Sequence, residues 1–410
     1  MGPPRPWNLF SSHTLTPALD SSGNPFEGSI GPAGAADWLF AVVDGDGTVV
    51  LSATSGQTVY VGILTFTISG GFAAAAIDWV PVTTATTVND IWHIFAHGSH
   101  WISFSYTALS TTSSVADVTL LNFTTADITA AIASSSPLTP TSTVVYSQTD
   151  TTALVLRTDG GYSTNDHFIS ATLQGIALGL WRGAPGYAAS TYLGVPVDPA
   201  VVTLIELSIG PVALLDTAQA RGPSTIAATG SAQTLVGMTG FGLWHPKLWM
   251  CVPTDISPDS TGNYAENTLE LLSMSPTQSD AASEGSIGDP GYNLQMGTFV
   301  RLANGDFVVV YKSVPAGTAE YPSSGGVRQE DWGSVEVKVL DPTLTIEEYT
   351  ETFLEAASDL PADKMANRPH CVQWGRYLIT VWVEATYDSS FPSLTPGNGY
   401  LRIDELVGVP

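Results

Sequence analysis

Acidic residues stand at the start of three apolar segments of this 410-residue sequence, and they are the clearest candidates for chemistry. Asp37 precedes a Trp-Leu-Phe run, Asp90 precedes Ile-Trp, and Asp166 precedes His-Phe. Two carboxyl groups at a suitable separation can serve as the acid and the base or nucleophile of glycoside hydrolysis. Cationic and imidazole side chains accompany them at comparable positions: Arg368, His93, His167, His245 and His370. The competing interpretation is that all these groups satisfy backbone atoms where strands begin.

Two further groups of residues suggest metal binding. Asp44 and Asp46 lie in the run Asp-Gly-Asp-Gly-Thr, which is similar to the start of a calcium loop. That run lacks the later glutamate of an EF-hand, and a hairpin turn is also expected there. His93, His97 and His100 fall within eight positions, but a Gly-Ser turn separates the last from the others. We therefore expect no cofactor, with Ca²⁺ at Asp44 and Asp46 as the alternative.

Most of the eleven tryptophans lie inside apolar segments and are expected to belong to the core. Trp79 and Trp332 differ, because each follows an aspartate, Asp78 or Asp331. Their amphipathic rings are candidates for stacking on a sugar or for an interface with another chain.

An apolar strand pattern recurs along the chain and predicts how these residues are positioned. Segments of alternating Val, Leu, Ile and Thr begin at positions 201, 267, 333 and 399, which are 66 residues apart, with earlier copies at 117 and 58. A hairpin-like pair of apolar segments precedes each copy: 37–51, 90–105, 166–181, 241–252, 297–311 and 368–382. Turn pairs such as Asn304-Gly305 suit two-residue hairpins. The pattern predicts an all-β, six-bladed β-propeller.

The expected blades are residues 36–88, 89–142, 143–235, 236–291, 292–358 and 359–410 of one domain. The last blade ends at its third strand, so we expect residues 12–19 to supply the fourth, with 14–19 pairing beside 399–406. Fourth strands of other blades are expected at 209–215 and 345–353. Helix is plausible only at 73–76 and 345–358. Two stacked β-sandwiches are the alternative fold.

Three of the strand pairs, at residues 90–105, 299–311 and 368–382, resemble blades of the carbohydrate-active propellers, of both the sialidase and the arabinanase/xylosidase types. The resemblance implies a site in the central funnel. A sialidase-type site would need three arginines and a tyrosine nucleophile, yet only Arg301 and Arg368 fall in plausible inner strands. Residues 257–262 fit the Asp-box pattern imperfectly, with one residue too many. An arabinanase-type site would use Asp37, Asp90 and Asp166.

Charge and composition exclude some partners. The chain has 38 Asp and Glu against 13 Lys and Arg, and a formal net charge of −25. This field repels nucleic acid and anionic membranes. No apolar run of 18 residues is present, so no membrane insertion is expected. The N-terminus lacks the basic start and apolar run of a signal peptide. Cys251 and Cys371 are expected to be buried free thiols.

Three functional hypotheses remain. The first is a non-catalytic structural or adhesion propeller of a virion, such as a phage tail, or of another surface assembly. Such a protein would be made in the cytoplasm without a signal peptide, and would bind neighbouring proteins, further copies of itself or a host glycan. The second is a glycan-active hydrolase that uses the funnel carboxylates. The third is a generic protein-binding propeller.

Overall fold

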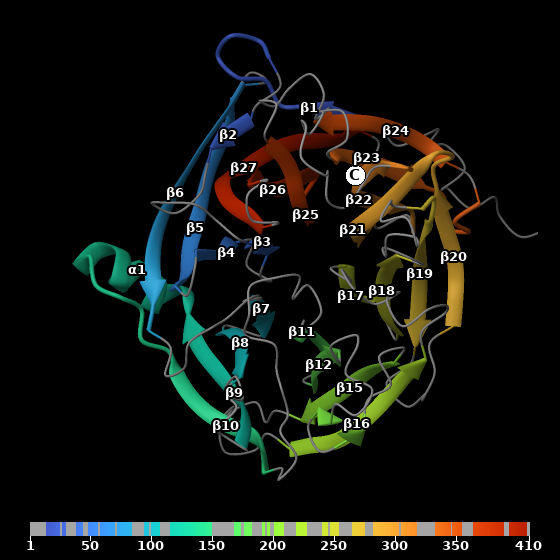
Figure 1. Cartoon of the computed structure of the whole chain (residues 1–410). Helices are drawn as coiled ribbons and strands as arrows, with labels where there is room; N and C mark the ends of the chain where they lie inside the picture. Colours follow the sequence, from blue (N-terminus) through green and yellow to red (C-terminus); the bar gives the residue numbers. More distant parts are fainter. Residues whose placement is uncertain are drawn as a thin grey trace, which may run out of the picture.

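The structure is a computed structural model (Figure 1). It describes residues 14–24, 27–29, 38–43, 48–55, 58–69, 72–83, 94–97, 100–106, 115–149, 168–173, 176–182, 191–192, 195–196, 201–208, 219–227, 240–244, 247–253, 265–274, 282–302, 305–317, 333–345, 347–354, 364–388 and 393–407. Side chains are described in a smaller set: 15–24, 48–53, 58–67, 75–83, 121–142, 265–271, 284–294, 298–302, 305–317, 333–345, 349–353, 366, 369–384 and 397–407.

The described residues form mostly β-strands, arranged in six antiparallel sheets that follow one another along the chain. The first sheet is β3 (Trp38–Val43), β4 (Val49–Ser55), β5 (Thr58–Ser69) and β6 (Phe72–Val82). The second is β7 (Ile94–His97), β8 (His100–Tyr106), β9 (Val115–Thr124) and β10 (Thr141–Thr149). The third is β11 (Phe168–Leu173), β12 (Ile176–Arg182), β15 (Val201–Ser208) and β16 (Gln219–Ala227). A small hairpin of β13 (Thr191–Tyr192) and β14 (Val195–Pro196) lies between the second and third strands of that sheet in sequence.

The remaining three sheets repeat the same plan. The fourth is β17 (Gly240–Trp244), β18 (Lys247–Pro253), β19 (Thr268–Met274) and β20 (Ala282–Gly288). The fifth is β21 (Tyr292–Arg301), β22 (Phe307–Pro315), β23 (Ser334–Leu340) and β24 (Glu347–Leu354). The sixth is β25 (Lys364–Trp374), β26 (Tyr377–Asp388), β27 (Ser393–Val407) and β1 (Thr14–Pro17), with β2 (Glu27–Ser29) also paired to β27.

The predicted repeat is confirmed at the level of strands. Each of the six recurring segments is the third strand of its sheet, and each preceding hairpin supplies the first and second strands. Gly305 has a φ of +99°, but its loop is longer than the expected two-residue hairpin, because β21 ends at Arg301 and β22 begins at Phe307. Gly375, in the two-residue turn between β25 and β26, has a φ of +56°. These are left-handed values that glycine adopts without strain.

The sheets are arranged around a common centre, with their first strands inside and their fourth strands outside (Figure 1). Each first strand contacts the first strand of the next sheet in the order β3, β7, β11, β17, β21, β25. The strand β25 also contacts β3, so the series of contacts returns to its beginning.

The expected pairing of the two ends of the chain is confirmed. Leu15 lies opposite Leu406 and Pro17 lies opposite Asp404 in the antiparallel pair β1–β27. The pairing continues one residue further, where the Ala18 amide donates to the carbonyl oxygen of Ile403 at 2.9 Å. The N-terminal strand is therefore the fourth strand of the sixth sheet.

Three expectations about local structure were wrong. Residues 73–76 lie in β6 and residues 347–354 form β24, so neither segment is helical; the latter is the fourth strand that was the alternative. Pairing with β5 and β23 outweighs the helical preference of Ala and Glu, because intrinsic propensity is weaker than tertiary contact. Strand β10 also runs to Thr149, beyond the blade boundary expected at residue 142. Residues 209–215, expected as a fourth strand, lie outside the described residues, and β16 takes that place in the third sheet.

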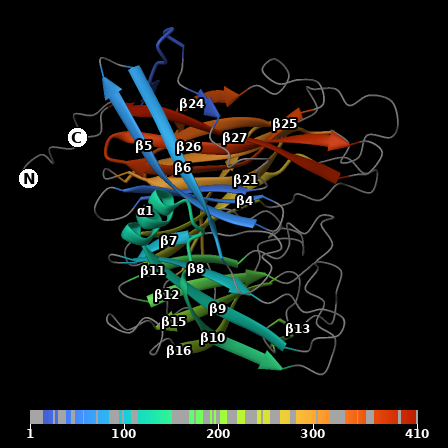
Figure 2. The same cartoon turned by 90° about the vertical axis from the view of Figure 1, so that its left-hand side faces the viewer.

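The described residues contain one helix, α1 (Thr125–Ser134), which the periodicity did not predict. A capping box starts it: the Asp127 amide donates to Thr124 Oγ1 at 3.2 Å, and the Thr124 amide donates to Asp127 Oδ2 at 2.8 Å. Figures 1 and 2 show α1 beside β6 on the outside of the sheets. No helix in the described part of the chain is long and apolar enough to span a membrane.

The core lies between neighbouring sheets. Every residue of β22 from Phe307 to Val314 is buried. Val308 and Val310 pack toward the sixth sheet, whereas Val309 and Tyr311 pack in a cluster with the fourth sheet. A strand buried on both faces reads as a continuous apolar run, which explains the sequence of this segment.

Candidate functional site

Most of the predicted site residues lie outside the described residues: Asp37, Asp44, Asp46, Asp90, His93, Asp166, His167, His245 and Trp332. Their roles stay predictions. His97 and His100 are directly opposite each other across the turn between β7 and β8. Among the side chains that are described, no three His, Cys, Asp or Glu residues form a group that could hold a metal ion.

Arg368 and His370 belong to β25, at the centre of the sheets. The register of β25 against β26 shifts between Asn367 and His370, so Arg368 lies in a bulge. The neighbouring first strand β21 has a similar irregularity, between Gln295 and Thr298. Bulges re-aim side chains and are common beside binding sites. The structure therefore brings two irregular backbone segments together on adjacent first strands, one of which carries Arg368.

A buried contact joins these two strands just beyond the bulges. The amide of Cys371 donates to Thr298 Oγ1 at 3.1 Å, and that hydroxyl lies 3.4 Å from Cys371 Sγ. Burial raises the pKa of the Cys371 thiol to about 12, although the contact with Thr298 acts in the opposite direction. Cys371 forms no disulfide, as expected for a buried free thiol. A thiol held neutral in this way is not a nucleophile at ordinary pH.

Trp79, on β6, packs against its own sheet. It lies opposite Gly62 of β5, and a side chain at Gly62 would meet the Trp79 ring at 3.0 Å and Ile77 Cγ2 at 2.6 Å. The missing side chain of Gly62 therefore makes room for the indole, which packs against the cluster between the first and sixth sheets. Trp79 is partly buried, and its role in binding a sugar stays a prediction.

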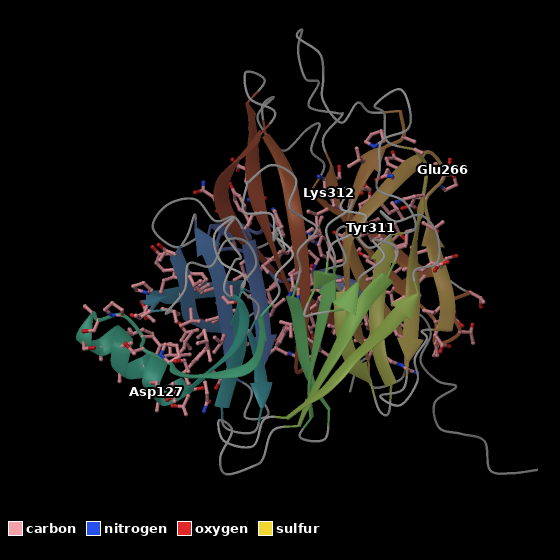
Figure 3. All side chains as sticks on the ribbon, turned by 60° about the horizontal axis from the view of Figure 1, so that its bottom comes forward. Asp127, Glu266, Tyr311 and Lys312 are labelled. Carbon is pink, nitrogen blue, oxygen red and sulfur yellow. The ribbon has the colours of Figure 1, made fainter. Side chains whose placement is uncertain are left out.

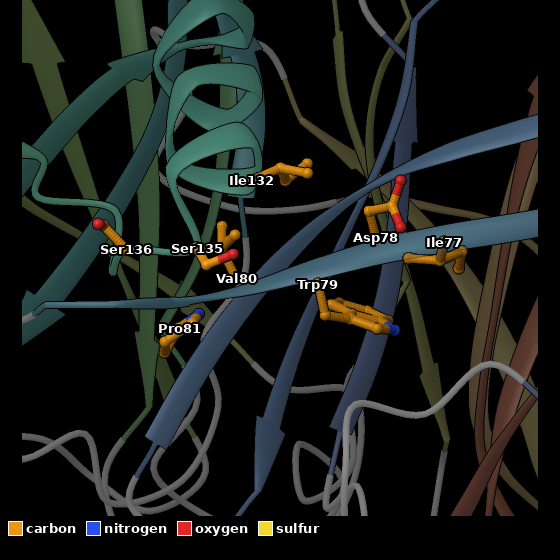
Figure 4. A pocket seen from close by; sticks show the side chains of 8 residues that line it. All are labelled: Ile77, Asp78, Trp79, Val80, Pro81, Ile132, Ser135 and Ser136. Atoms are coloured by element: carbon orange, nitrogen blue, oxygen red, sulfur yellow. The ribbon is translucent and has the colours of Figure 1, made fainter.

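A pocket of about 360 Å³ lies between β6 and α1, and we call it the β6–α1 pocket. It is lined by Ile77, Asp78, Trp79, Val80, Pro81, Ile132, Ser135 and Ser136 (Figure 4). Asp78 lies on the same side of β6 as the helix, whereas the Trp79 indole lies on the other side (Figure 4). The Asp78 carboxylate is exposed. Asp78 and Trp79, which are adjacent in the sequence, therefore lie on opposite faces of β6.

The end of α1 closes one side of this pocket. Ser135 adopts a left-handed conformation with φ of 51°, and its amide caps the helix by donating to Ile132 O at 3.1 Å. The last turn contains no basic residue. The partial negative charge of a helix C-terminus therefore adds to the charge of Asp78 at this pocket.

Sequence reasoning missed a buried ionic cluster between the fifth and sixth sheets. The guanidinium of Arg402, on β27, donates to Asp404 Oδ1 at 3.0 Å and to Glu351 Oε1 of β24 at 2.8 Å. It also lies 3.9 Å from the centre of the Phe353 ring. Arg402 is 3% exposed and Asp404 is fully buried. The feature of the sequence that could have indicated this cluster is the pair of opposite charges, Arg402 and Asp404, inside the apolar strand 401–406.

The electrostatics of this cluster favour its ionised form. Burial alone would lower the pKa of Arg402, but the carboxylates of Asp404 and Glu351 raise it above its usual value. Burial raises the pKa of Tyr349, and the hydrogen bond from its hydroxyl to Glu351 raises it further. The cluster joins two sheets through charge-assisted hydrogen bonds.

A second, partly buried cluster holds the turn between β20 and β21 against the fifth sheet. Lys338 Nζ lies 2.5 Å from Asp289 Oδ1, and the Tyr311 hydroxyl donates to Asp289 Oδ2 at 2.7 Å. Nearby, the Asn267 side chain bonds the backbone of Leu294 through both its oxygen, at 2.5 Å, and its nitrogen, at 3.0 Å. Figure 3 shows Tyr311 inside the molecule and Asp127 and Glu266 at its outer surface. The Asn267 contacts therefore join the start of β19 to β21, whereas the Asp289 contacts hold the turn between β20 and β21.

No protein-family profile and no curated protein matches the sequence. Among solved structures, the chain is similar to a protein of unknown function from Dyadobacter fermentans, with a TM-score of 0.49, 9% identity, and coverage of 93% of this chain and 98% of that one. The haemagglutinin-neuraminidase of parainfluenza virus 5 has a TM-score of 0.49, 8% identity and 96% coverage of both chains. Xylan β-1,4-xylosidase from Bacillus halodurans has a TM-score of 0.38 and 10% identity, and the match covers 81% of this chain and 57% of that one. At these TM-scores and identities, none of the three likenesses indicates a function for this chain.

Proposed function

We propose that the protein is a closed six-bladed β-propeller that serves as a non-catalytic structural or adhesion component of a virion or another surface assembly. In that role it binds neighbouring subunits or a host glycan. The observation that carries this proposal is the pairing of β1 with β27, which ties the two ends of the described chain into one sheet.

Closure is supported by contacts at both the inner and outer ends of the sixth sheet. Its first strand, β25, contacts β3 of the first sheet, and its fourth strand comes from the N-terminus. Leu15 and Leu406 are both buried in the cluster between the fifth and sixth sheets. Two stacked sandwiches would not require the last sheet to contact the first. In a closed ring β1 also covers the edge of β27, which would otherwise be bare and open to aggregation.

A structural role is further supported by how the chain uses its scarce cations. Two of its 13 Lys and Arg residues are buried in ion pairs: Arg402 with Glu351 of the neighbouring sheet, and Lys338 with Asp289 of the turn that precedes β21. The large excess of acidic residues keeps many copies soluble before assembly. Both features suit a durable component that persists outside the cell.

The assembly role is tested by its location. Particles and other assemblies released by the source cells are purified on a density gradient, and their proteins are identified by mass spectrometry. We expect this chain at a fixed ratio to known structural proteins, and genes for portal, tail or capsid proteins beside its own. Its recovery only as a free monomer, away from every particle fraction, would contradict the role.

Glycoside hydrolysis is the second candidate, and the bulge that carries Arg368 at the centre of the sheets is the observation that favours it. The purified chain is incubated with a panel of aryl glycosides, sialosides included. Our proposal predicts no turnover. Turnover that is lost in Asp90→Asn, Asp166→Asn or Arg368→Ala but kept in the surface variant Glu266→Gln would establish the hydrolase instead.

A further inference from the structure

We propose that the outer edge of β6, beside the β6–α1 pocket, binds an extended segment of another protein as an added antiparallel or parallel strand, and that this segment places a basic residue beside Asp78. This inference rests on the proposed role in binding neighbouring subunits, and it names the surface and the chemistry of the partner.

The edge of β6 differs from the other outer edges of the described sheets. Strand β6 pairs with β5 over eleven consecutive residue pairs without a register shift. The outer strands β10, β16, β20 and β24 each contain at least one shift in their pairing. The sixth outer strand, β1, is four residues long and contains Pro17. Bulges, proline and short length all protect an edge from further pairing. Strand β6 contains Pro81, but it has no bulge and is eleven residues long.

The backbone of β6 presents hydrogen-bonding groups to this edge. Leu138 N donates to Pro81 O at 2.9 Å and Thr83 N donates to Leu138 O at 2.7 Å, so residues 81 and 83 direct their backbone groups away from β5. Thr65 Oγ1 of β5 donates to the carbonyl oxygen of Ala76, so the backbone groups of Ala76 point toward β5. Because the backbone groups of successive residues point to alternate edges of an uninterrupted strand, those of Ala75 and Ile77 also point away from β5.

The outward groups of Ala75 and Ile77 have no backbone partner among the described residues. Only the far end of the edge is covered, by the bridge between Val82 and Leu138. The segment 72–80 has no lysine, arginine or proline, which natural edge strands use against unwanted pairing. An unbroken and unprotected edge of this length suits the addition of a strand.

The charge around the edge selects the partner. Asp78 points into the β6–α1 pocket, next to the C-terminal end of a helix that has no basic residue in its last turn. Both contribute negative potential, and the whole chain carries −25. A second copy of this chain would bring the same charge and another Asp78. A segment with Lys or Arg instead complements the pocket, so the partner is a different protein with a basic extended segment.

The pocket also explains how such a segment would be recognised. The β6–α1 pocket lies beside the outer edge of β6 and is lined by residues of β6 and by the end of α1 (Figure 4), so a strand added to β6 would run next to it. Main-chain hydrogen bonds supply affinity in this mode, and pockets for alternate side chains supply specificity. The Asp78 carboxylate and the Ser135 and Ser136 side chains are placed to contact a basic side chain of the added strand.

The test uses a displayed library of random ten-residue peptides, selected on the full-length chain and counter-selected on Ala75→Pro. This substitution removes an outward amide and leaves the inward ladder to β5 intact, as Pro81 already does in the same strand. We expect enriched peptides with alternating apolar residues and one Lys or Arg. Fluorescence anisotropy of the labelled peptide should show binding at least tenfold weaker to Ala75→Pro and unchanged binding to Glu266→Gln.

If Ala75→Pro lowers the Tm too far for binding measurements, a second experiment exchanges the charges of Asp78 and of the basic residue in the peptide. Asp78→Lys should weaken the basic peptide at least tenfold, and a peptide with Glu in place of its Lys should recover the loss. Hydrogen exchange should show new protection at the amides of Ala75 and Ile77 when the peptide is bound.

Four outcomes would overturn the inference. The library could enrich no basic peptide, the selected peptides could bind folded Ala75→Pro as well as the original chain, or sedimentation could reveal a dimer that Ala75→Pro dissociates. Sugar binding that is sensitive to Asp78→Asn and insensitive to Ala75→Pro would likewise replace the peptide with a glycan. The particle analysis is independent of all of these, so the assembly role can stand when this docking surface fails.

Discussion

At the scale of single residues, Arg402 of β27 and Arg376, in the turn between β25 and β26, have opposite environments. Arg402 is 3% exposed and neutralises a fully buried Asp404. The Arg376 side chain is 58% exposed and lies 3.4 Å from Glu405 across open surface. Removing one partner of a buried pair leaves an uncompensated charge, whereas an exposed pair contributes little.

We therefore predict that Arg402→Met lowers the free energy of unfolding by about 3–5 kcal/mol. The matched change Arg376→Met should lower it by less than about 1 kcal/mol. Urea denaturation followed by tryptophan fluorescence measures both. Equal effects of the two substitutions would show that the cluster between the fifth and sixth sheets contributes no more to the free energy of unfolding than an exposed ion pair does.

Cys371 predicts a specific dependence of stability on pH. The thiol ionises near pH 9 in the unfolded chain and near 12 in the folded one, because burial disfavours the thiolate. The stability that comes from this difference is complete below pH 9 and is lost as the pH rises toward 12, by about 1.4 kcal/mol per pH unit.

The measurement compares the original chain with Cys371→Ala in urea at pH 8, 9 and 10. The difference between their free energies of unfolding should shrink above pH 9. A difference that stays constant over this range would mean that the thiol is accessible to solvent. Iodoacetamide in a Cys251→Ser background provides the control, since native Cys371 should react only on unfolding.

At the scale of elements, α1 depends on its capping box. We predict that Thr124→Ala lowers the free energy of unfolding by about 1 kcal/mol, because it leaves the Asp127 amide without its acceptor. Thr129→Ala, in the middle of the exposed face, should be neutral or slightly stabilising, because alanine has the higher helix propensity. Thermal unfolding by circular dichroism measures both, and an equal loss for the two variants would contradict the capping role.

The strands of the sheets could be predicted because their signal is local. Alternation of apolar residues and tight Gly-containing turns specify a hairpin within about fifteen residues. The helix was missed although Thr124 and Asp127 carry the spacing of a capping box, since its ten residues fall between strong strand signals. The run 73–76 was instead expected to be helical and lies in a strand, because alanine favours helix until a partner strand pairs with it.

At the scale of the whole molecule, the closing pair β1–β27 should control stability. Deletion of residues 1–19 exposes the edge of β27 and removes Leu15 from the core, and the loss of one buried leucine alone costs about 2–5 kcal/mol. We predict a lower Tm for the truncated chain, which rises again with the logarithm of the concentration of a synthetic peptide of residues 12–20.

The matched peptide carries Leu15→Asp and should restore nothing. If the truncated chain melts like the original, or if both peptides act equally, the N-terminal strand does not close the ring. Thermal shift measurements at several peptide concentrations distinguish these results.

The sequence by itself determined the all-β class, the order of the first three strands in each sheet and the pairing of the N-terminus with the last strand. Each follows from periodicity two, from turn residues and from a repeat that stops one strand short. Only the tertiary structure decided that Arg402 meets Glu351, 51 positions away, and that Thr298 meets Cys371, 73 positions away. It also decided that β6 has an unbroken edge beside α1. Those features depend on bulges and on the packing of separate sheets, where a shift of one residue reverses every side chain, so local patterns cannot specify them.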